Sequence, residues 1–213
     1  MPDSIRHLTL PLSEHDVRGL ALGTMVTITG TVFTGRSRFH IRAIDDDIVP
    51  PIDFAQHNCF FHVGPVMRRE GDTWQVVSIE PTSSIRFERY GGAVVRKLGL
   101  RALIGKTTMG RDTAAALRDV GGVHLTKIGV CGNLLAPQVT RVRAVHFLEE
   151  LGKTEATWLF DVERFGPFFV DIDAQGNNYF QQLDADIRSR MKAVHRDLGI
   201  PDDFAYTNVN PDD

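Results

Sequence analysis

The sequence predicts an α/β protein in which a β-rich layer is joined to a layer of alternating strands and helices. Three observations predict it. The first half holds runs of β-branched and aromatic residues, the middle alternates short apolar runs with helical patterns, and an amphipathic helix follows near the end. With 213 residues, 42% of them hydrophobic, the chain can bury a substantial core. We expect one domain over residues 1–200 and a loose tail over residues 201–213.

The first half is expected to form three strands. In the first of them, aliphatic residues alternate with threonines, which is the pattern of a half-buried strand. The expected strands cover residues 23–33, 59–66 and 73–79. A basic stretch, TGRSRFH at residues 34–40, breaks the pattern after the first strand, and Gly71-Asp72 is typical of a hairpin between the other two.

The middle of the chain is expected to fold as a βαβ unit with parallel strands. The expected elements are a helix over residues 86–98, a strand over 100–104, a helix over 112–120 and a strand over 123–130. Gly99 and Gly121 stand where helices commonly end. Gly91 and Gly92 each weaken the first helix by roughly 1 kcal/mol relative to alanine, which suggests close backbone packing at that point.

Three more strands and one long helix are expected in the last third. The strands cover residues 142–148, 157–162 and 167–173, and Gly176-Asn177 marks a turn after them. Five apolar residues then recur at steps of three and four and form one stripe of a helix. They are Leu183, Ile187, Met191, Val194 and Leu198.

Charge and hydropathy exclude two classes of partner. The formal net charge is −3, so the chain lacks the basic footprint of a nucleic-acid-binding protein. No stretch approaches the ~18 apolar residues that a membrane-spanning helix requires, and the start of the chain lacks the apolar core of a signal peptide. We therefore expect no nucleic acid and no membrane as partners, and a cytoplasmic location.

The cysteines and histidines offer no metal site in this chain. Cys59 and Cys131 lie in different local settings and are expected to be single thiols, because disulfides are rare in reducing compartments. Two cysteines are also too few to hold an iron–sulfur cluster alone. The spacing of His57 and His62 places them on neither one helical face nor one strand face.

The segment GKTTMG, residues 105–110, resembles a phosphate-binding loop only superficially. That motif would need a glycine at position 100, where the chain has Leu100, so nucleotide hydrolysis is disfavoured. Lys106 instead follows a predicted parallel strand, the end at which α/β sheets bind ligands. Arg36, Arg38 and Arg86 stand in two other loops that follow strands. Cations that converge from three loops would suit a substrate with two carboxylates.

A second segment, IEPTSSIRFERYGG, admits two interpretations. The hydroxyls of Thr82, Ser83 and Ser84 are suited to capping the helix that follows. The free N–H groups of that helix, together with Arg86, are also suited to binding an anion. The two interpretations are compatible with each other.

Several segments resemble one known family. GTVFTGRSRFH, FHVGPVMRREGDTWQVVSIEPTSSIRFE, IGKTTMG and GPFFVDIDAQGNN are similar to the β subunit of L-tartrate dehydratase and to the C-terminal domain of class I (iron–sulfur) fumarases. The blocks follow the family order over roughly residues 8–180. The resemblance implies the swivelling β/β/α domain of these hydro-lyases.

The resemblance also implies a reaction and a partner. Members hydrate or dehydrate a C4 dicarboxylate, such as fumarate and malate, or L-tartrate, which gives oxaloacetate. A larger α partner supplies three cysteines for a [4Fe-4S] cluster, so the cluster would be ligated by that chain and not by this one. The cluster's open iron acts as a Lewis acid on the substrate hydroxyl. Assembly as αβ and as a dimer of αβ both stay open.

Matching the family motifs assigns roles to five residues. Thr82 is the candidate base, and Lys106 is a second catalytic candidate that also binds substrate. Arg36, Arg86 and His40 correspond to the remaining substrate-binding positions. A threonine hydroxyl is a very weak base, so its role requires that cations such as Lys106 and Arg86 lower its pKa in a dry pocket.

The chain departs from the family pattern at five positions, which puts the identity of the substrate in question. Ser37 replaces an aspartate, Ser83 replaces a threonine and Phe87 replaces a methionine. Thr107 and Thr108 replace two glycines beside the lysine, which adds bulk where the backbone would approach a ligand. The alternative to an enzyme subunit is a non-catalytic dicarboxylate-binding or assembly domain that retains the fold.

Overall fold

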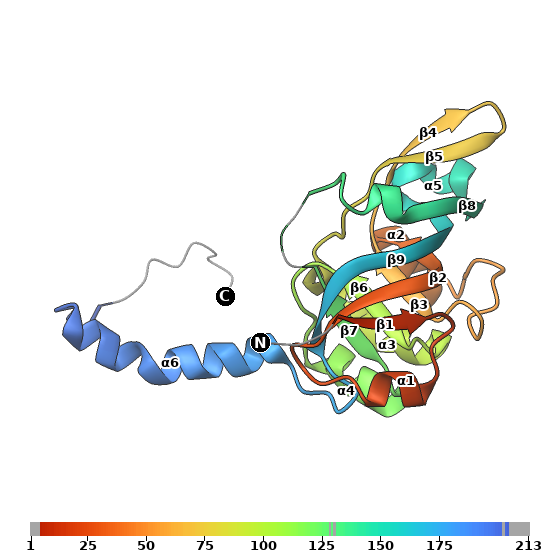
Figure 1. The fold of residues 1–213 in the computed structure, drawn as a ribbon. Helices are drawn as coiled ribbons and strands as arrows, with labels where there is room; N and C mark the ends of the chain where they lie inside the picture. Colours follow the sequence, from red (N-terminus) through yellow and green to blue (C-terminus); the bar gives the residue numbers. More distant parts are fainter. Residues whose placement is uncertain (1–4, 128, 130, 202, 205–213) are drawn as a thin grey trace. The chain divides into compact units, whose positions relative to one another are not determined.

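A computed structural model describes residues 5–127, 129, 131–201 and 203–204 of the chain (Figure 1). Its contacts divide the chain into two units, Met1–Asn178 and Tyr179–Asp213. The expected single domain ends at residue 200, whereas the first unit ends at Asn178. Each unit is described by itself.

The first unit mixes strands with short helices, which confirms the α/β class. The strands are β1 (Arg6–Thr9), β2 (Met25–Gly35), β3 (Cys59–His62), β4 (Val66–Glu70), β5 (Thr73–Ser78), β6 (Ala102–Gly105), β7 (Val123–Thr126), β8 (Val139–His146) and β9 (Thr157–Ile172). The helices are α1 (Glu14–Arg18), α2 (Ser37–Ile44), η1 (Ser84–Phe87), α3 (Glu88–Leu98), α4 (Arg111–Val120), η2 (Ala136–Gln138) and α5 (Leu148–Glu155). The narrower assignment to a swivelling β/β/α domain stays a prediction.

Seven strands form one mixed sheet in the order β1-β2-β3-β6-β7-β9-β8 (Figure 1). Strands β2, β3, β6 and β7 are parallel to one another, as the βαβ pattern predicts. The antiparallel strand β9 pairs with β7 on one side and with β2 as well, so five strands close on themselves. Strands β4 and β5 form a separate hairpin.

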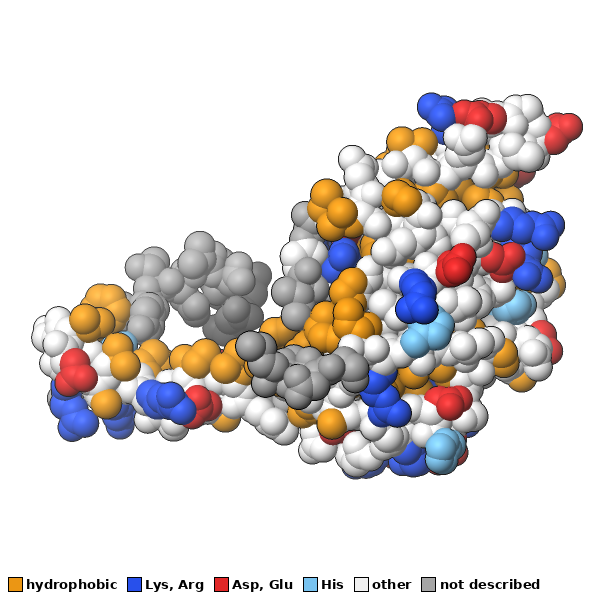
Figure 2. Space-filling model, in the orientation of Figure 1, with side chains coloured by type: hydrophobic (Ala, Val, Ile, Leu, Met, Phe, Trp, Pro, Cys, Tyr) orange, Lys and Arg blue, Asp and Glu red, His pale blue; other side chains and the backbone are white. Residues whose placement is uncertain are grey.

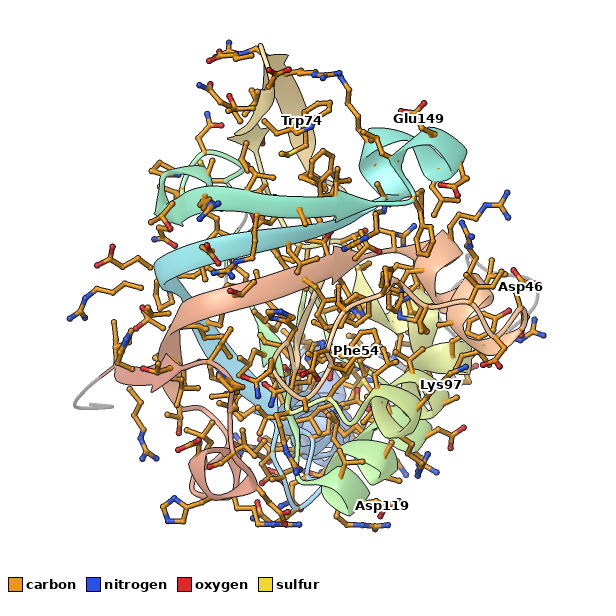
Figure 3. The ribbon with its side chains drawn as sticks, turned by 90° about the vertical axis from the view of Figure 1, so that its right-hand side faces the viewer. Asp46, Phe54, Trp74, Lys97, Asp119 and Glu149 are labelled. Carbon is orange, nitrogen blue, oxygen red and sulfur yellow. The ribbon has the colours of Figure 1, made fainter. Side chains whose placement is uncertain are left out.

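Alternate residues of the parallel strands point to opposite faces of the sheet and build two apolar clusters. One cluster contains Val32, Phe61 and Ile104 and includes residues of α1 and β9. The other cluster contains Phe33 and Leu103, and helices α2, α3 and α4 cover it. Phe54, from the loop after α2, contacts Phe33 in this second cluster, with 5.5 Å between ring centroids (Figure 3).

The structure corrects four of the expected boundaries. Residues 59–66 are not one strand, because Val63 pairs with Pro81 instead and β4 begins only at Val66. The expected break at residues 34–40 contains the end of β2 and the start of α2. The two strands expected over residues 157–173 are one strand, β9. The strand expected over residues 123–130 ends at Thr126, and residues 128 and 130 lie outside the described part of the chain.

Helices α3 and α4 pack closely at the two glycines of α3, as the sequence predicts. A Cβ atom on Gly91 would lie 2.2 Å from Thr113 Oγ1, and one on Gly92 would lie 2.9 Å from the carbonyl oxygen of Asp112. Gly99 ends α3 in the left-handed conformation, with φ of 63°. Both glycines of α3 are therefore required by the approach of α4.

The β4–β5 hairpin leaves the sheet between His62 and Pro81, and its turn lies at Gly71, as expected. Trp74 points from the hairpin toward β9, where its ring lies 5.2 Å from that of Trp158 (Figure 3). Charged side chains of both signs gather at the hairpin tip, and Arg68 forms an ion pair with Glu70 at 2.6 Å (Figure 2).

The second unit contains α6 (Tyr179–Asp197), which confirms the expected C-terminal helix. Hydrophobic side chains run along this helix beside charged ones (Figure 2). Residues 202 and 205–213 of the expected tail lie outside the described residues. Within the described part of the chain, no helix combines the length and the apolar character needed to span a membrane.

Candidate active site

The ends of β3 and β6 hold an extended segment, residues 81–84, between them. The amide of Thr82 donates a hydrogen bond to the carbonyl of His62, 2.8 Å long. On the other side, the amide of Lys106 donates to the carbonyl of Thr82 at 3.1 Å, and the amide of Ser84 donates to the carbonyl of Lys106 at 2.9 Å. Two residues predicted for the site, Thr82 and Lys106, are therefore paired directly at the carboxyl ends of parallel strands, where α/β sheets bind ligands.

Arg86 lies against the same segment. Its Nη2 donates a short hydrogen bond to Thr82 Oγ1, and its Nε lies 3.4 Å from the carbonyl of Ser83. A guanidinium group that donates to a hydroxyl oxygen stabilises the deprotonated form of that hydroxyl. Arg86 is exposed and Thr82 is half-buried, so the contact supplies one of the cations that a threonine base requires, and the role of Thr82 stays a prediction.

Arg36 directly follows β2, whose last residue, Gly35, is aligned with His62. Its side chain crosses Gly64, where a Cβ atom would lie 2.7 Å from Arg36 Cδ. The Nε of Arg36 lies 3.9 Å from a carboxylate oxygen of Glu155. This Nε is buried and, among the described residues, donates no hydrogen bond; its part in binding a substrate carboxylate stays a prediction.

His40 lies one helical turn beyond Arg36 and beneath the surface. Its Nδ1 is hydrogen-bonded to the carbonyl of Arg36 at 2.8 Å, and its ring stacks on that of Phe87 with 4.5 Å between centroids. Burial lowers the pKa of His40 to about 4, so the ring is neutral at neutral pH. The structure therefore places His40 under Arg36, and the part of both residues in substrate binding stays a prediction.

Acidification is expected to destabilise the first unit through His40. Because its pKa is about 4 in the folded state and near 6.5 when unfolded, its contribution is complete above pH 6.5 and is lost as the pH falls toward 4. The loss is on the order of 3 kcal/mol. Chemical denaturation at pH 7.5 and pH 4.5 should show a smaller pH dependence for His40→Asn than for the wild type.

The exposed His15 is the matched control for this measurement. The variant His15→Asn should keep the wild-type pH dependence. An unchanged pH dependence in His40→Asn would contradict the assignment of a buried neutral ring.

The lysine loop contains a strained backbone position. Thr107 has a φ of 65°, in the left-handed region that glycine adopts easily and β-branched residues avoid. Its hydroxyl donates to the carbonyl of Lys106. Thr108 instead accepts a hydrogen bond of 2.9 Å from Asn178 Nδ2. The two threonines that depart from the family glycines thus have different local environments.

Replacing Thr107 by glycine is expected to stabilise the chain. Relief of the left-handed strain outweighs the added flexibility of the unfolded chain, so the free energy of unfolding should rise by roughly 0.5–1 kcal/mol. The matched variant Thr108→Gly should lower it by about 1 kcal/mol or more, because it loses a hydrogen bond without relieving strain. Denaturant titration of both variants checks this, and equal destabilisation by both would contradict it.

The helix-capping interpretation of residues 82–84 is wrong. Ser83 precedes η1 without a side-chain capping bond, and Ser84 Oγ is hydrogen-bonded to His62 Nδ1 at 2.9 Å. The N-terminus of α4 is capped instead by Glu88, whose carboxylate accepts from the amide of Gly110 at 2.6 Å and from Thr113 Oγ1 at 2.8 Å. Because an internal carboxylate already fills the helix N-terminus after GKTTMG, a phosphate has no place there.

Sequence reasoning missed a set of buried polar side chains beneath the paired segment. They are His62, Ser84, His124 and Asp171. The signal that could have revealed them is a histidine or aspartate at the centre of an apolar run, as in VHLT and FVDI. Interactions between residues far apart in sequence bring them together, which no local pattern reveals.

The described residues of this chain do not fit an iron–sulfur cluster or another metal. Among the described residues, no three His, Cys, Asp or Glu side chains are grouped so as to hold a metal ion. Both cysteines are free, as expected, and Cys59 is buried while Cys131 is exposed. Burial raises the pKa of the Cys59 thiol far above its usual value, which disfavours the thiolate that a metal requires.

Comparison with known proteins gives consistent results. Residues 4–183 match the family model described as "Fumarase C-terminus". The chain is 34% identical over 171 residues to "L(+)-tartrate dehydratase subunit beta" of Escherichia coli (strain K12), covering 80% of this chain and 84% of that protein. It is 32% identical over 186 residues to "Putative L(+)-tartrate dehydratase subunit beta" of Methanocaldococcus jannaschii, covering 86% of this chain and 95% of that protein.

A third relative is longer than this chain. "Putative fumarate hydratase class I" of Geobacillus stearothermophilus is 36% identical over 178 residues, which cover 83% of this chain but only 34% of that protein. The matched region is therefore one part of a larger polypeptide in that relative.

Proposed function

The chain belongs to the fumarase C-terminus family, and on that premise we propose that it is the β subunit of a two-chain hydro-lyase. The enzyme adds water to a C4 dicarboxylate or removes water from it, with fumarate and malate, or L-tartrate and oxaloacetate, as the substrate pairs. The observation that carries the proposal is the direct pairing of Thr82 with Lys106, with the guanidinium of Arg86 on the threonine hydroxyl.

Each residue of the pairing has a role in this reaction. Lys106 and Arg36 directly follow β6 and β2, and Arg86 lies in η1 beside Thr82. These three cations would bind the two carboxylates of the substrate. Thr82 Oγ1 would take the proton from the carbon next to the one that carries the hydroxyl group, and return it in the hydration direction. Thr82 Oγ1, which starts as the deprotonated oxygen, would hold the transferred proton, and the hydroxide that leaves as the C–O bond breaks would be accepted by the Lewis acid that the partner's cluster supplies. Arg86 favours this role because it stabilises the deprotonated oxygen.

The proposed partner is a larger α chain that carries a [4Fe-4S] cluster. Support comes from the names of the relatives, two of which are beta subunits, and from the longer relative, in which the matched region is 34% of the polypeptide. Since the described residues of this chain do not fit a cluster, we place its ligands in the partner. Assembly beyond αβ and a cytoplasmic location stay predictions from the sequence.

Anaerobic co-expression with the larger partner tests the proposal. The two chains should co-purify, and the assembly should hydrate fumarate, dehydrate L-tartrate, or act on a methylated relative of these acids. Each chain alone should be inactive. An assembly that contains an intact cluster and transforms no member of the panel would contradict the proposed substrate class. Weak dicarboxylate binding by this chain alone, without activity of the assembly, would favour the non-catalytic alternative.

A further inference from the structure

Four fully buried polar side chains lie beneath the Thr82–Lys106 pairing and have no role in the reaction described above. His124 Nδ1 donates to Asp171 Oδ1 at 2.6 Å, and Ser84 Oγ is bonded to His62 Nδ1 at 2.9 Å. Asp171 Oδ2 and the Nε2 atoms of both histidines are buried and, within the described part of the chain, have no hydrogen-bond partner.

Such groups are costly in the interior of a sheet. His124 lies in a strand whose four residues are all buried, and Asp171 lies in a buried stretch of β9. A buried ionisable pair that leaves polar atoms without partners destabilises a fold relative to apolar side chains of the same size. The cluster therefore calls for an explanation other than stability.

Gly105 connects this cluster to the catalytic segment. A Cβ atom on Gly105 would lie 1.7 Å from Ser84 Oγ and 3.2 Å from His124 Nε2, so the hydroxyl and the imidazole both lie against this glycine. Gly105 directly precedes Lys106, and Ser84 follows Thr82 by two residues. Because the amide of Ser84 also donates to the carbonyl of Lys106, a shift of Ser84 would move the lysine and the threonine together.

Hydrogen-bond chemistry then fixes how the cluster can be arranged. The Asp171 carboxylate accepts the Nδ1 proton of His124, which directs the opposite ring edge, with Nε2, toward Gly105 and Ser84. Burial, together with the neighbouring His40 and His124, lowers the pKa of His62 well below its usual value, so the His62 ring is neutral. Ser84 Oγ is therefore bonded to His62 and lies against the same glycine as His124 Nε2, whose ring is oriented by Asp171 from outside the segment.

We propose that the His124–Asp171 pair, acting through Ser84 and His62, positions the Thr82–Lys106 pairing for catalysis. These four are positioning residues, since none of them reaches the surface where a substrate binds. The order Ser84, His124, Asp171 has the elements of a hydrolytic triad, but a buried serine that is already bonded to His62 cannot act as a nucleophile on a substrate. The predicted effect on the catalytic rate rests on the proposed function. The predicted effect on the backbone pairing of Thr82, Ser84 and Lys106 does not.

Amide hydrogen exchange of the full-length chain tests, without any substrate, whether the four buried residues hold the backbone pairing in place. Asp171→Asn should raise the exchange rates of the Ser84 and Lys106 amides at least tenfold. The matched control is Asn58→Ala at the opposite end of β3, where Asn58 Oδ1 accepts from the amide of Leu12 at 3.0 Å. That variant should raise exchange at Leu12 and leave Ser84 and Lys106 unchanged.

Kinetics of the assembled enzyme test the predicted effect on the catalytic rate. Asp171→Asn should lower kcat at least tenfold. KM should change less than threefold, because the groups proposed to contact the carboxylates remain. The control variant Asn58→Ala should keep kcat within twofold. Ser84→Ala should give the same pattern as Asp171→Asn and serves if that variant fails to fold. Exchange and kcat that change no more than in Asn58→Ala would overturn the proposal. If Asp171→Asn alters amide exchange but the assembly formed by the wild-type chain is inactive, the proposed function is overturned. The role of the pair in positioning the segment is then retained.

Discussion

Replacing Thr82 by valine is expected to lower kcat of the assembled enzyme by a factor of about 10³, because general acid–base groups typically contribute 10²–10⁴. Valine keeps the branched shape of threonine and removes only the oxygen that accepts from Arg86. The backbone bonds of Thr82 to His62 and Lys106 do not involve the side chain, so the fold and the partner contact should persist. Steady-state rates with fumarate and with L-tartrate check the result.

The neighbouring residue is a suitable control for this substitution. Ser83 departs from the family pattern, and its side chain makes no capping bond in η1. Ser83→Ala should therefore keep kcat within about threefold of the wild type. The base assignment would be lost if Thr82→Val were as active as Ser83→Ala.

Replacing Arg86 by lysine is expected to lower kcat/KM by a factor of about 10² to 10³. The guanidinium reaches Thr82 Oγ1 through Nη2 and the carbonyl of Ser83 through Nε, and a lysine ammonium cannot reproduce this planar fork. Charge is conserved in the variant, so a large loss would show that geometry, and not the positive charge alone, is needed. Initial rates over a range of substrate concentrations separate the effects on kcat and KM.

Arg89 on α3 provides the matched control. It is exposed, and its guanidinium lies 5.4 Å from the centre of the Tyr90 ring. Arg89→Lys should leave kcat/KM within about twofold. A similar loss in both variants would indicate a general requirement for arginine over η1 and the start of α3, and would remove the specific role of Arg86.

The elements with a clear period could be predicted from the sequence. The alternation in β2, the glycines that end α3 and α4, and the stripe of α6 are local patterns, and the structure confirms them. The division of residues 59–66 could not be predicted, because it depends on the bridge between Val63 and Pro81 across an intervening hairpin. Residues 157–172 likewise form one strand, β9, and not two, because β9 pairs with β2 along its length.

The candidate site shows the same limit. Thr82, Arg86 and Lys106 could be selected by family resemblance, but their pairing depends on a segment that lies between two strand ends. The expected caps at Thr82–Ser84 were wrong because Ser84 bonds to His62, 22 residues away, and not to the helix. The His124–Asp171 pair joins residues 47 apart, which no local pattern could reveal.

The rate of the Lys106→Ala assembly tests the central claim most directly, namely that this sheet edge is the catalytic face of a hydro-lyase. The backbone pairing of Lys106 with Thr82 persists in the alanine variant, so the substitution removes the ammonium group from this edge and leaves the segment in place. Under the proposed function, kcat/KM for the preferred dicarboxylate should fall at least 10²-fold while the partner still co-purifies. The exposed Lys192→Ala variant should retain the wild-type value. Equal activity of the two variants would contradict the account.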